Sequence, residues 1–146
     1  MPLASKGHPN RLGIWGWLGG GRWGAERYLY TLHRLTGLGI LAYFLLHIIV
    51  TSSRALGQAR WTQAMGAVSG PLFKVGEYLV FLAFAFHAIN GIRLGIIELG
   101  FGVGRPIEPV YPYRTSLDVQ RPIAIGVLAL AAVLVVLGTL NFWVLE

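Results

Sequence analysis

Three long apolar stretches, separated by more polar segments, dominate the hydrophobic pattern of the chain. They run over about 35–53, 76–97 and 123–145 and contain few charged residues. A helix needs about 20 apolar residues to cross the hydrocarbon core of a bilayer, since each residue adds about 1.5 Å. The pattern therefore predicts an all-α integral membrane protein, with three transmembrane helices in a single domain over 1–146.

The segments between the apolar stretches carry residues that interrupt helices. Residues 58–71 are expected to form a short loop that contains Gly66 and Gly70. The segment 98–122 is longer and holds four prolines. Proline has no amide hydrogen for the helix interior, so the second helix should end before this segment, and Pro122 suits the first turn of the third.

Composition agrees with a membrane protein and excludes several other classes. The 146 residues are 55% hydrophobic and only 12% charged, whereas soluble domains average about 25% charged residues. A net charge of +6 would suit a nucleic-acid partner, but the basic residues are scattered singly and form no stripe. Without cysteine, the sequence offers no thiolate ligand for an iron–sulfur cluster or a zinc ion.

The distribution of Lys and Arg predicts the orientation in the membrane. Nine of the twelve Lys and Arg residues lie in two regions: the N-terminal tail with the start of the first span, and the second loop with its borders. They are Lys6, Arg11, Arg22, Arg27, Arg34, Arg93, Arg105, Arg114 and Arg121. The first loop and its borders hold the other three: Arg54, Arg60 and Lys74. The N-terminal segment 1–34 and the loop 98–122 are therefore expected in the cytoplasm, and the C-terminus outside.

Aromatic residues stand where membrane interfaces are expected. Trp15, Trp17 and Trp23 suit a segment that lies on the cytoplasmic leaflet before the first span. Phe142 and Trp143 suit an aromatic belt at the opposite face.

Two histidines lie well inside the predicted spans, where ionisable residues are costly and often functional. His87 shares a helix face with Gly91 and Gly95, which leaves room for a flat group such as haem. The same glycines equally suit a helix-packing groove across which His87 makes a hydrogen bond. For His47, the pattern alone favours a histidine that is hydrogen-bonded to a neighbouring helix.

Charges near the cytoplasmic boundary indicate the depth of each histidine. At about 1.5 Å per residue, His47 lies about 20 Å beyond Arg34, whereas His87 lies about 9 Å from Arg93. The two imidazoles are therefore not expected to bind one iron together. For Arg34 and Arg93 two roles stay open, extension to lipid headgroups or pairing with a carboxylate such as a haem propionate.

Two short motifs resemble those of the cytochrome b membrane-anchor subunit of succinate dehydrogenase. LHRLTG, at 32–37, resembles the HR-x-[ST]-G signature at the head of its first span. HAINGIR, at 87–93, resembles the H-x-x-x-G-I-R signature of its second span. The resemblance extends over roughly 28–100, and the family also has three spans and a cytoplasmic N-terminus.

This resemblance implies one half of a haem-binding helical bundle, the other half being a second membrane-anchor subunit. A flavoprotein subunit would oxidise succinate, and an iron–sulfur subunit would carry the electrons to the membrane. The bundle would hold haem b and bind a quinone, either menaquinone or ubiquinone. No catalytic residue is implied in this chain, and assembly into a trimer of complexes is suggested by analogy with the family.

The resemblance also implies the roles of individual residues. His87 is expected to be an axial ligand of the haem iron, with the second ligand supplied by the other anchor subunit. The residues implied near the haem propionates or the quinone are His33, Arg34, Arg93, Tyr30 and Thr31. Many relatives have a serine of the quinone pocket where Tyr30 stands, so the Tyr30 hydroxyl is a candidate donor to a quinone carbonyl.

Relatives that hold two haems, one near each membrane face, have a histidine midway along the first span. His47 occupies that position, so two haems are favoured, His87 binding the cytoplasmic one and His47 the distal one; a single haem is the alternative. The expected location is the cytoplasmic membrane of a bacterium or archaeon. Two further alternatives are a fumarate reductase anchor, and a non-redox membrane anchor or transporter subunit whose histidines are structural.

Overall fold

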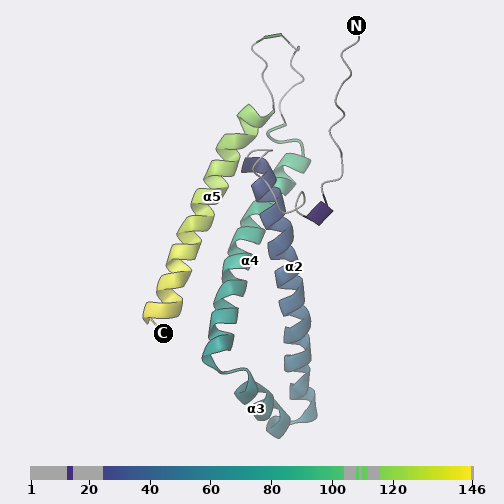
Figure 1. The fold of residues 1–146 in the computed structure, drawn as a ribbon, viewed down its shortest axis with the longest axis vertical. Helices are drawn as coiled ribbons and strands as arrows, with labels where there is room; N and C mark the ends of the chain where they lie inside the picture. Colours follow the sequence, from purple (N-terminus) through teal and green to yellow (C-terminus); the bar gives the residue numbers. More distant parts are fainter. Residues whose placement is uncertain (1–12, 15–24, 104–107, 109, 112–115, 146) are drawn as a thin grey trace.

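The structure is a computed structural model that describes residues 13–14, 25–103, 108, 110–111 and 116–145 (Figure 1). Its elements in chain order are α2 (Ala25–Ser52), the 3-10 helix η1 (Ser53–Leu56), α3 (Gln58–Ala67), α4 (Pro71–Glu98), α5 (Leu117–Leu140) and the π-helix η2 (Asn141–Leu145). Three segments are long and apolar enough to cross a membrane: Glu26–Leu56, Pro71–Glu98 and Leu117–Leu145. The predicted all-α class with three spans is confirmed.

The first helix starts well before its apolar stretch. α2 begins at Ala25 rather than near Leu35, so part of the expected N-terminal segment is helical. Glu26 lies in the first turn, where a negative charge stabilises the positive end of the helix dipole. Leu29 and Thr31 are buried, so these added turns also pack against the protein. The tryptophans expected at the interface, Trp15, Trp17 and Trp23, lie outside the described residues.

The third helix also starts early, at Leu117, and this places Pro122 in the helix interior instead of the first turn. A proline there removes the hydrogen bond that its own amide would donate to the carbonyl of Asp118. Asp118 lies in the first turn and stabilises the helix dipole. Helix formation around the proline explains why the apolar pattern placed the start of this helix too late.

The loop expected at 58–71 contains the ten-residue helix α3. Gln, Ala, Arg and Met, which make up most of α3, all favour helix, although the segment is too polar to register as a span. Gly57 precedes α3 with φ of 98°, a conformation that disfavours residues with a side chain, and it turns the chain between η1 and α3. Pro71 then occupies the first turn of α4, where its missing amide hydrogen costs nothing.

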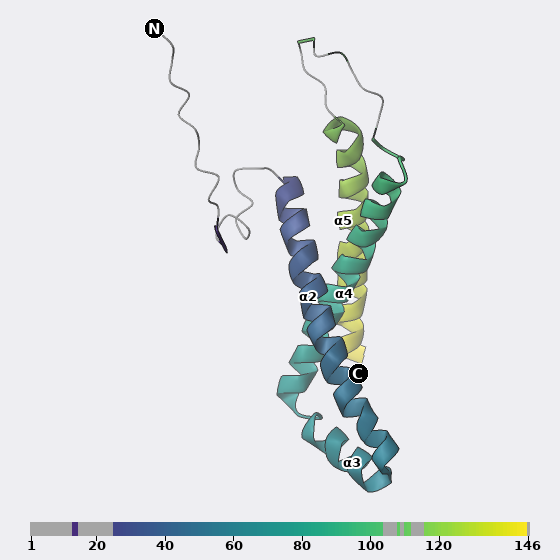
Figure 2. The ribbon, with the colours of Figure 1, turned by 90° about the vertical axis from the view of Figure 1, so that its right-hand side faces the viewer.

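α4 is the central helix, because it packs against both α2 and α5 (Figure 1). α2 and α4 approach each other in the first half of α2 and separate towards α3, which connects them. Figure 2 shows from the side that α2 crosses α4 at an angle. At the end where α2 and α5 begin, Arg121 Nε donates to Glu26 Oε1 over 3.1 Å and so links the two outer helices.

The helices bury few side chains against one another. The buried apolar residues of the described chain are Leu29, Ala85, Ile89 and Ala131. Large apolar side chains along all three spans are exposed instead, among them Leu46 on α2, Ile92 on α4 and Val136 on α5. Apolar surface of this extent requires a cover of lipid or of other protein subunits.

Close packing joins the second half of α5 to the first half of α4. A methyl group at Gly138 would overlap the ring of Phe81, so glycine is required for the approach of the two helices. One residue further, the hydroxyl groups of Tyr78 and Thr139 share a hydrogen bond of 2.7 Å.

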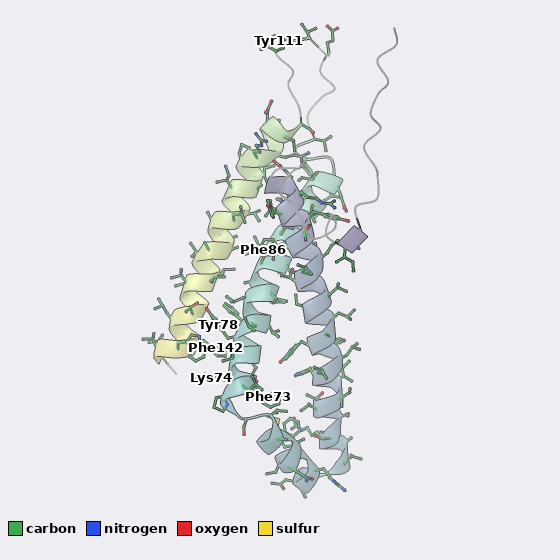
Figure 3. The ribbon with its side chains drawn as sticks, in the orientation of Figure 1. Phe73, Lys74, Tyr78, Phe86, Tyr111 and Phe142 are labelled. Carbon is green, nitrogen blue, oxygen red and sulfur yellow. The ribbon has the colours of Figure 1, made fainter. Side chains whose placement is uncertain are left out.

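Lys74, Tyr78 and Phe142 lie side by side at this end of the bundle (Figure 3). The Lys74 ammonium lies 5.4 Å from the ring centre of Phe142 and 5.6 Å from that of Trp143. The Tyr78 ring lies 5.5 Å from that of Phe142. These cation–π and aromatic contacts hold the C-terminal π-helix against α4.

Replacement of Gly138 by Ala is expected to destabilise the protein by about 1–3 kcal/mol, the usual cost of overpacking a close contact. Gly126→Ala is the matched control, because nothing lies within 4 Å of the methyl group it would add to the same helix. Thermal unfolding in detergent, followed by circular dichroism, measures both. Equal unfolding temperatures for the two variants would contradict the packing described for Gly138.

Candidate functional site

His33 on α2 and His87 on α4 stack face to face where the two helices approach each other. Their ring centres are 3.9 Å apart and the planes differ by 4°. The sequence singled out both histidines, but it gave no sign that they touch. The stack covers one face of the His87 imidazole and restricts its rotation.

The edge of the His87 ring is held by one turn of α2. Nδ1 of His87 lies 3.0 Å from the carbonyl oxygen of His33 and 3.3 Å from Oγ1 of Thr36. A carbonyl oxygen only accepts hydrogen bonds, so Nδ1 carries the hydrogen and donates it. In the neutral imidazole, Nε2 is then left with a free lone pair.

Nε2 of His87 is available to an external group. Every hydrogen bond that His87 makes within the described chain uses Nδ1. Nε2 is also absent from the buried polar atoms that lack a partner, so it keeps accessible surface. A neutral imidazole with one nitrogen bonded to a carbonyl and the other free is the usual state of a histidine that binds a metal.

Two glycines adjoin the histidine stack, but they differ in importance. A methyl group at Gly37 would lie 2.8 Å from Cε1 of His87, which is too close for carbon atoms. A methyl group at Gly91 would lie 3.6 Å from Cε1 of His33, an ordinary contact. Gly95, which continues the face of α4 that carries Gly91, has nothing within 4 Å of such a methyl group, so this part of the face is open.

Thr36 and Gly37 are therefore site residues to which the sequence analysis gave no role of their own, although they form the [ST]-G part of the HR-x-[ST]-G signature. They follow His33 by three and four residues, which places them on the same helix face. That spacing within the LHRLTG segment is the signal that was available. It became meaningful only when the structure placed His87 against this face.

A buried polar pair, Asn90 and Arg93, follows His87 along α4. Arg93 is 6% exposed, and its Nε donates to Oδ1 of Asn90 over 3.0 Å. Asn90 is completely buried. In the described chain, Nδ2 of Asn90 and Nδ1 of His33 are buried without a hydrogen-bond partner. Buried polar atoms are rarely left unpaired, so this region is suited to receive a polar group from outside the chain.

Tyr30 and Arg34 form a separate cluster on an exposed part of α2. The Tyr30 hydroxyl accepts a hydrogen bond of 2.6 Å from Nη1 of Arg34. The guanidinium carbons of Arg27 and Arg34 lie 5.3 and 5.4 Å from the centre of the Tyr30 ring. Thr31 is buried, so it does not share this environment although it follows Tyr30 directly.

His47 lies apart from these groups. It is exposed, and its ring is tilted against that of Tyr43 with the ring centres 5.7 Å apart. His47 follows His33 by fourteen residues, or about 21 Å along the helix. Because His33 contacts His87, the two histidines of the sequence prediction lie at different levels of the bundle.

No cluster of three or more His, Cys, Asp or Glu side chains able to hold a metal ion occurs within the described ranges. A haem iron needs fewer protein ligands than a free metal ion, since the porphyrin supplies four ligands and the protein supplies only the axial ones. The free Nε2 of His87, the buried guanidinium of Arg93 six residues further along α4, and the unpaired buried atoms fit a haem with acidic propionates.

Comparison with known proteins gives consistent matches. Residues 13–139 match the family described as succinate dehydrogenase/fumarate reductase transmembrane subunit. A succinate dehydrogenase hydrophobic membrane anchor subunit of Halobacterium salinarum is 30% identical over 87 residues, which cover 57% of this chain and 67% of the relative. A subunit of the same description from Archaeoglobus fulgidus is 28% identical over 78 residues, covering 53% and 67%. No solved structure matches.

Removal of the Asn90 side-chain amide is expected to destabilise the protein, because the buried guanidinium of Arg93 then lacks its hydrogen-bond partner. Asn90→Leu removes the acceptor of Arg93 and should lower the free energy of unfolding by about 1.5–3 kcal/mol. Adding Arg93→Met should recover part of this loss, because no unpaired charge is then buried. Thermal unfolding of both single variants and the double variant in detergent measures the coupling; strictly additive losses would show that the two side chains are independent.

Proposed function

Because this chain belongs to the family of succinate dehydrogenase/fumarate reductase transmembrane subunits, we propose that it is the membrane anchor of a succinate dehydrogenase that binds haem b and a quinone. Its three spans hold the complex in the membrane. A flavoprotein subunit oxidises succinate, an iron–sulfur subunit carries the electrons, and a second anchor subunit completes the helical bundle. The exposed apolar faces of the three helices support such a partner.

The environment of His87 is the observation that carries the proposal. Nδ1 donates to the His33 carbonyl, and this leaves the lone pair of Nε2 for iron. The stacked His33 ring holds the imidazole in place. Haem b, when bound, supplies a one-electron relay between the iron–sulfur subunit and the quinone. A residue of the other anchor subunit would supply the remaining protein ligand of the iron.

Arg93 and His33 are proposed to bind the haem propionates. A guanidinium binds a carboxylate through two parallel hydrogen bonds, and Arg93 uses only Nε for Asn90. A propionate would pair this buried charge, and a bound carboxylate would also accept from a protonated Nδ1 of His33. Asn90 holds the guanidinium in place through its hydrogen bond with Nε.

Tyr30 and Arg34 are proposed to contact the quinone. The Tyr30 hydroxyl accepts from Arg34, so its own hydrogen stays available for a quinone carbonyl. The two guanidinium groups over its ring favour partial negative charge at this place, as develops on a quinone that is being reduced. Thr31 is less suited to this role because it is buried.

His47 is proposed to bind a second haem, nearer the outer face. Its exposure leaves the ring accessible to a group held by the second anchor subunit, and its separation from His87 along the bundle supports two separate irons. The distribution of Lys and Arg supports a cytoplasmic N-terminus. It also supports placing His87 towards the cytoplasmic end of the bundle. The family description also includes fumarate reductase, while the two curated relatives are both succinate dehydrogenase anchors, which favours succinate oxidation.

His87→Ala is expected to abolish binding of the haem nearer the cytoplasm, because the axial nitrogen is lost. The purified complex should lose at least half of its Soret absorbance. Phe84→Ala is the control, since it removes an exposed side chain from the same helix. Unchanged haem content and spectrum in His87→Ala would refute the ligand assignment. A wild-type complex without a Soret band would instead favour a non-redox anchor.

Pyridine haemochrome quantification of the wild-type complex is expected to give two haems per copy of this chain. His47→Ala should reduce the number to one and leave the component that depends on His87. A single haem in the wild type, unchanged in His47→Ala, would contradict the proposed role of His47.

A further inference from the structure

We propose that Thr36 and Gly37 are positioning residues that fix the orientation and tautomer of the His87 imidazole as an iron ligand. Neither residue touches the iron or the quinone in this proposal; both act through His87. The inference rests on the proposed function, since it concerns the haem that His87 would bind. In this arrangement, the turn of α2 from His33 to Gly37 holds the imidazole of His87 on α4.

Gly37 provides the space that the His87 ring occupies against α2. A methyl group at position 37 would lie 2.8, 3.3 and 3.7 Å from Cε1, Nδ1 and Nε2 of His87, so any other residue would displace the ring. Gly39, two residues further along the same helix, would accept a methyl group with nothing within 4 Å. The requirement for glycine is therefore steric and is specific to position 37.

Thr36 provides a second acceptor for the hydrogen on Nδ1. Its Oγ1 lies 2.8 Å from the carbonyl oxygen of Leu32 and 3.0 Å from that of His33, so the hydroxyl hydrogen is used on the backbone. The lone pairs of Oγ1 are then left for the hydrogen of His87 Nδ1, 3.3 Å away. Nδ1–H is thus shared between a carbonyl and a hydroxyl of the same helical turn.

These contacts have an electronic consequence for the bound haem. A hydrogen bond from Nδ1–H makes the imidazole a stronger electron donor through Nε2, and stronger donation favours the oxidised iron. Removal of the Thr36 oxygen should therefore raise the haem reduction potential. A residue that only packs the helices would change stability without changing the potential.

The chain offers a matched control for each residue. Thr51 lies on the same helix and its hydroxyl bonds to the backbone in the same way, 2.7 Å from the carbonyl oxygen of His47, but no ring nitrogen faces it in the described structure. Gly39 serves as the control for Gly37. The variants are Thr36→Val, Thr36→Ser, Thr51→Val, Gly37→Ala and Gly39→Ala, each in the whole complex purified from membranes.

The measurements are an optical redox titration and the low-temperature EPR spectrum of the haem component that His87→Ala removes. Thr36→Val should raise its potential, by on the order of a tenfold change in the reduction equilibrium, or about 59 mV for one electron. Thr36→Ser should restore the wild-type value, and Thr51→Val should leave it unchanged. Gly37→Ala should shift the EPR signal of this haem or abolish it, whereas Gly39→Ala should not.

The outcomes separate this inference from the function it rests on. A wild-type complex without haem, or haem that survives in His87→Ala, overturns the proposed function. In a second outcome, the haem depends on His87 but keeps the wild-type potential and EPR spectrum in Thr36→Val and Gly37→Ala. That result overturns only the positioning role of Thr36 and Gly37. If Thr36→Val does not assemble, the same titration on Thr36→Ala decides, and an unchanged potential there is equally contrary to the proposal.

Discussion

The contact between the His87 imidazole and one turn of α2 is the interaction on which the rest of the site depends. A polar ring inside a membrane helix has to satisfy its hydrogen-bonding nitrogen, and the carbonyl of His33 does so at 3.0 Å. That contact exists only because Gly37 allows the ring to approach. Once Nδ1 is engaged, the chemistry left to His87 is that of the Nε2 lone pair, and this is the property that a haem ligand requires.

Few apolar side chains are buried between the helices of the described chain. The helices bury polar groups such as Asn90 and Arg93 in the second half of α4, while many large apolar side chains are exposed. A soluble protein would arrange these groups the other way round. The arrangement suits one half of a bundle, in which lipid covers part of the outer surface and other subunits cover the rest.

The sequence predicted much of the architecture but less of the site. Hydrophobic patterning found all three spans, because burial in lipid depends on composition over about 20 residues. It missed α3, whose helix-forming residues are too polar to register, and it started α2 and α5 too late, since their first turns are polar. His33 and His87 were found as motif residues. Their stack, and the roles of Thr36 and Gly37, depend on a contact between helices that no local pattern specifies.

An experimental density map of the purified complex would test the assignment of His87 most directly. We predict a porphyrin beside the His87 ring, with iron bonded to Nε2, Nδ1 directed at the carbonyl of His33 and the second axial ligand supplied by another subunit. A map in which the imidazole lies among aliphatic side chains, with no macrocycle next to it, would contradict the proposed function.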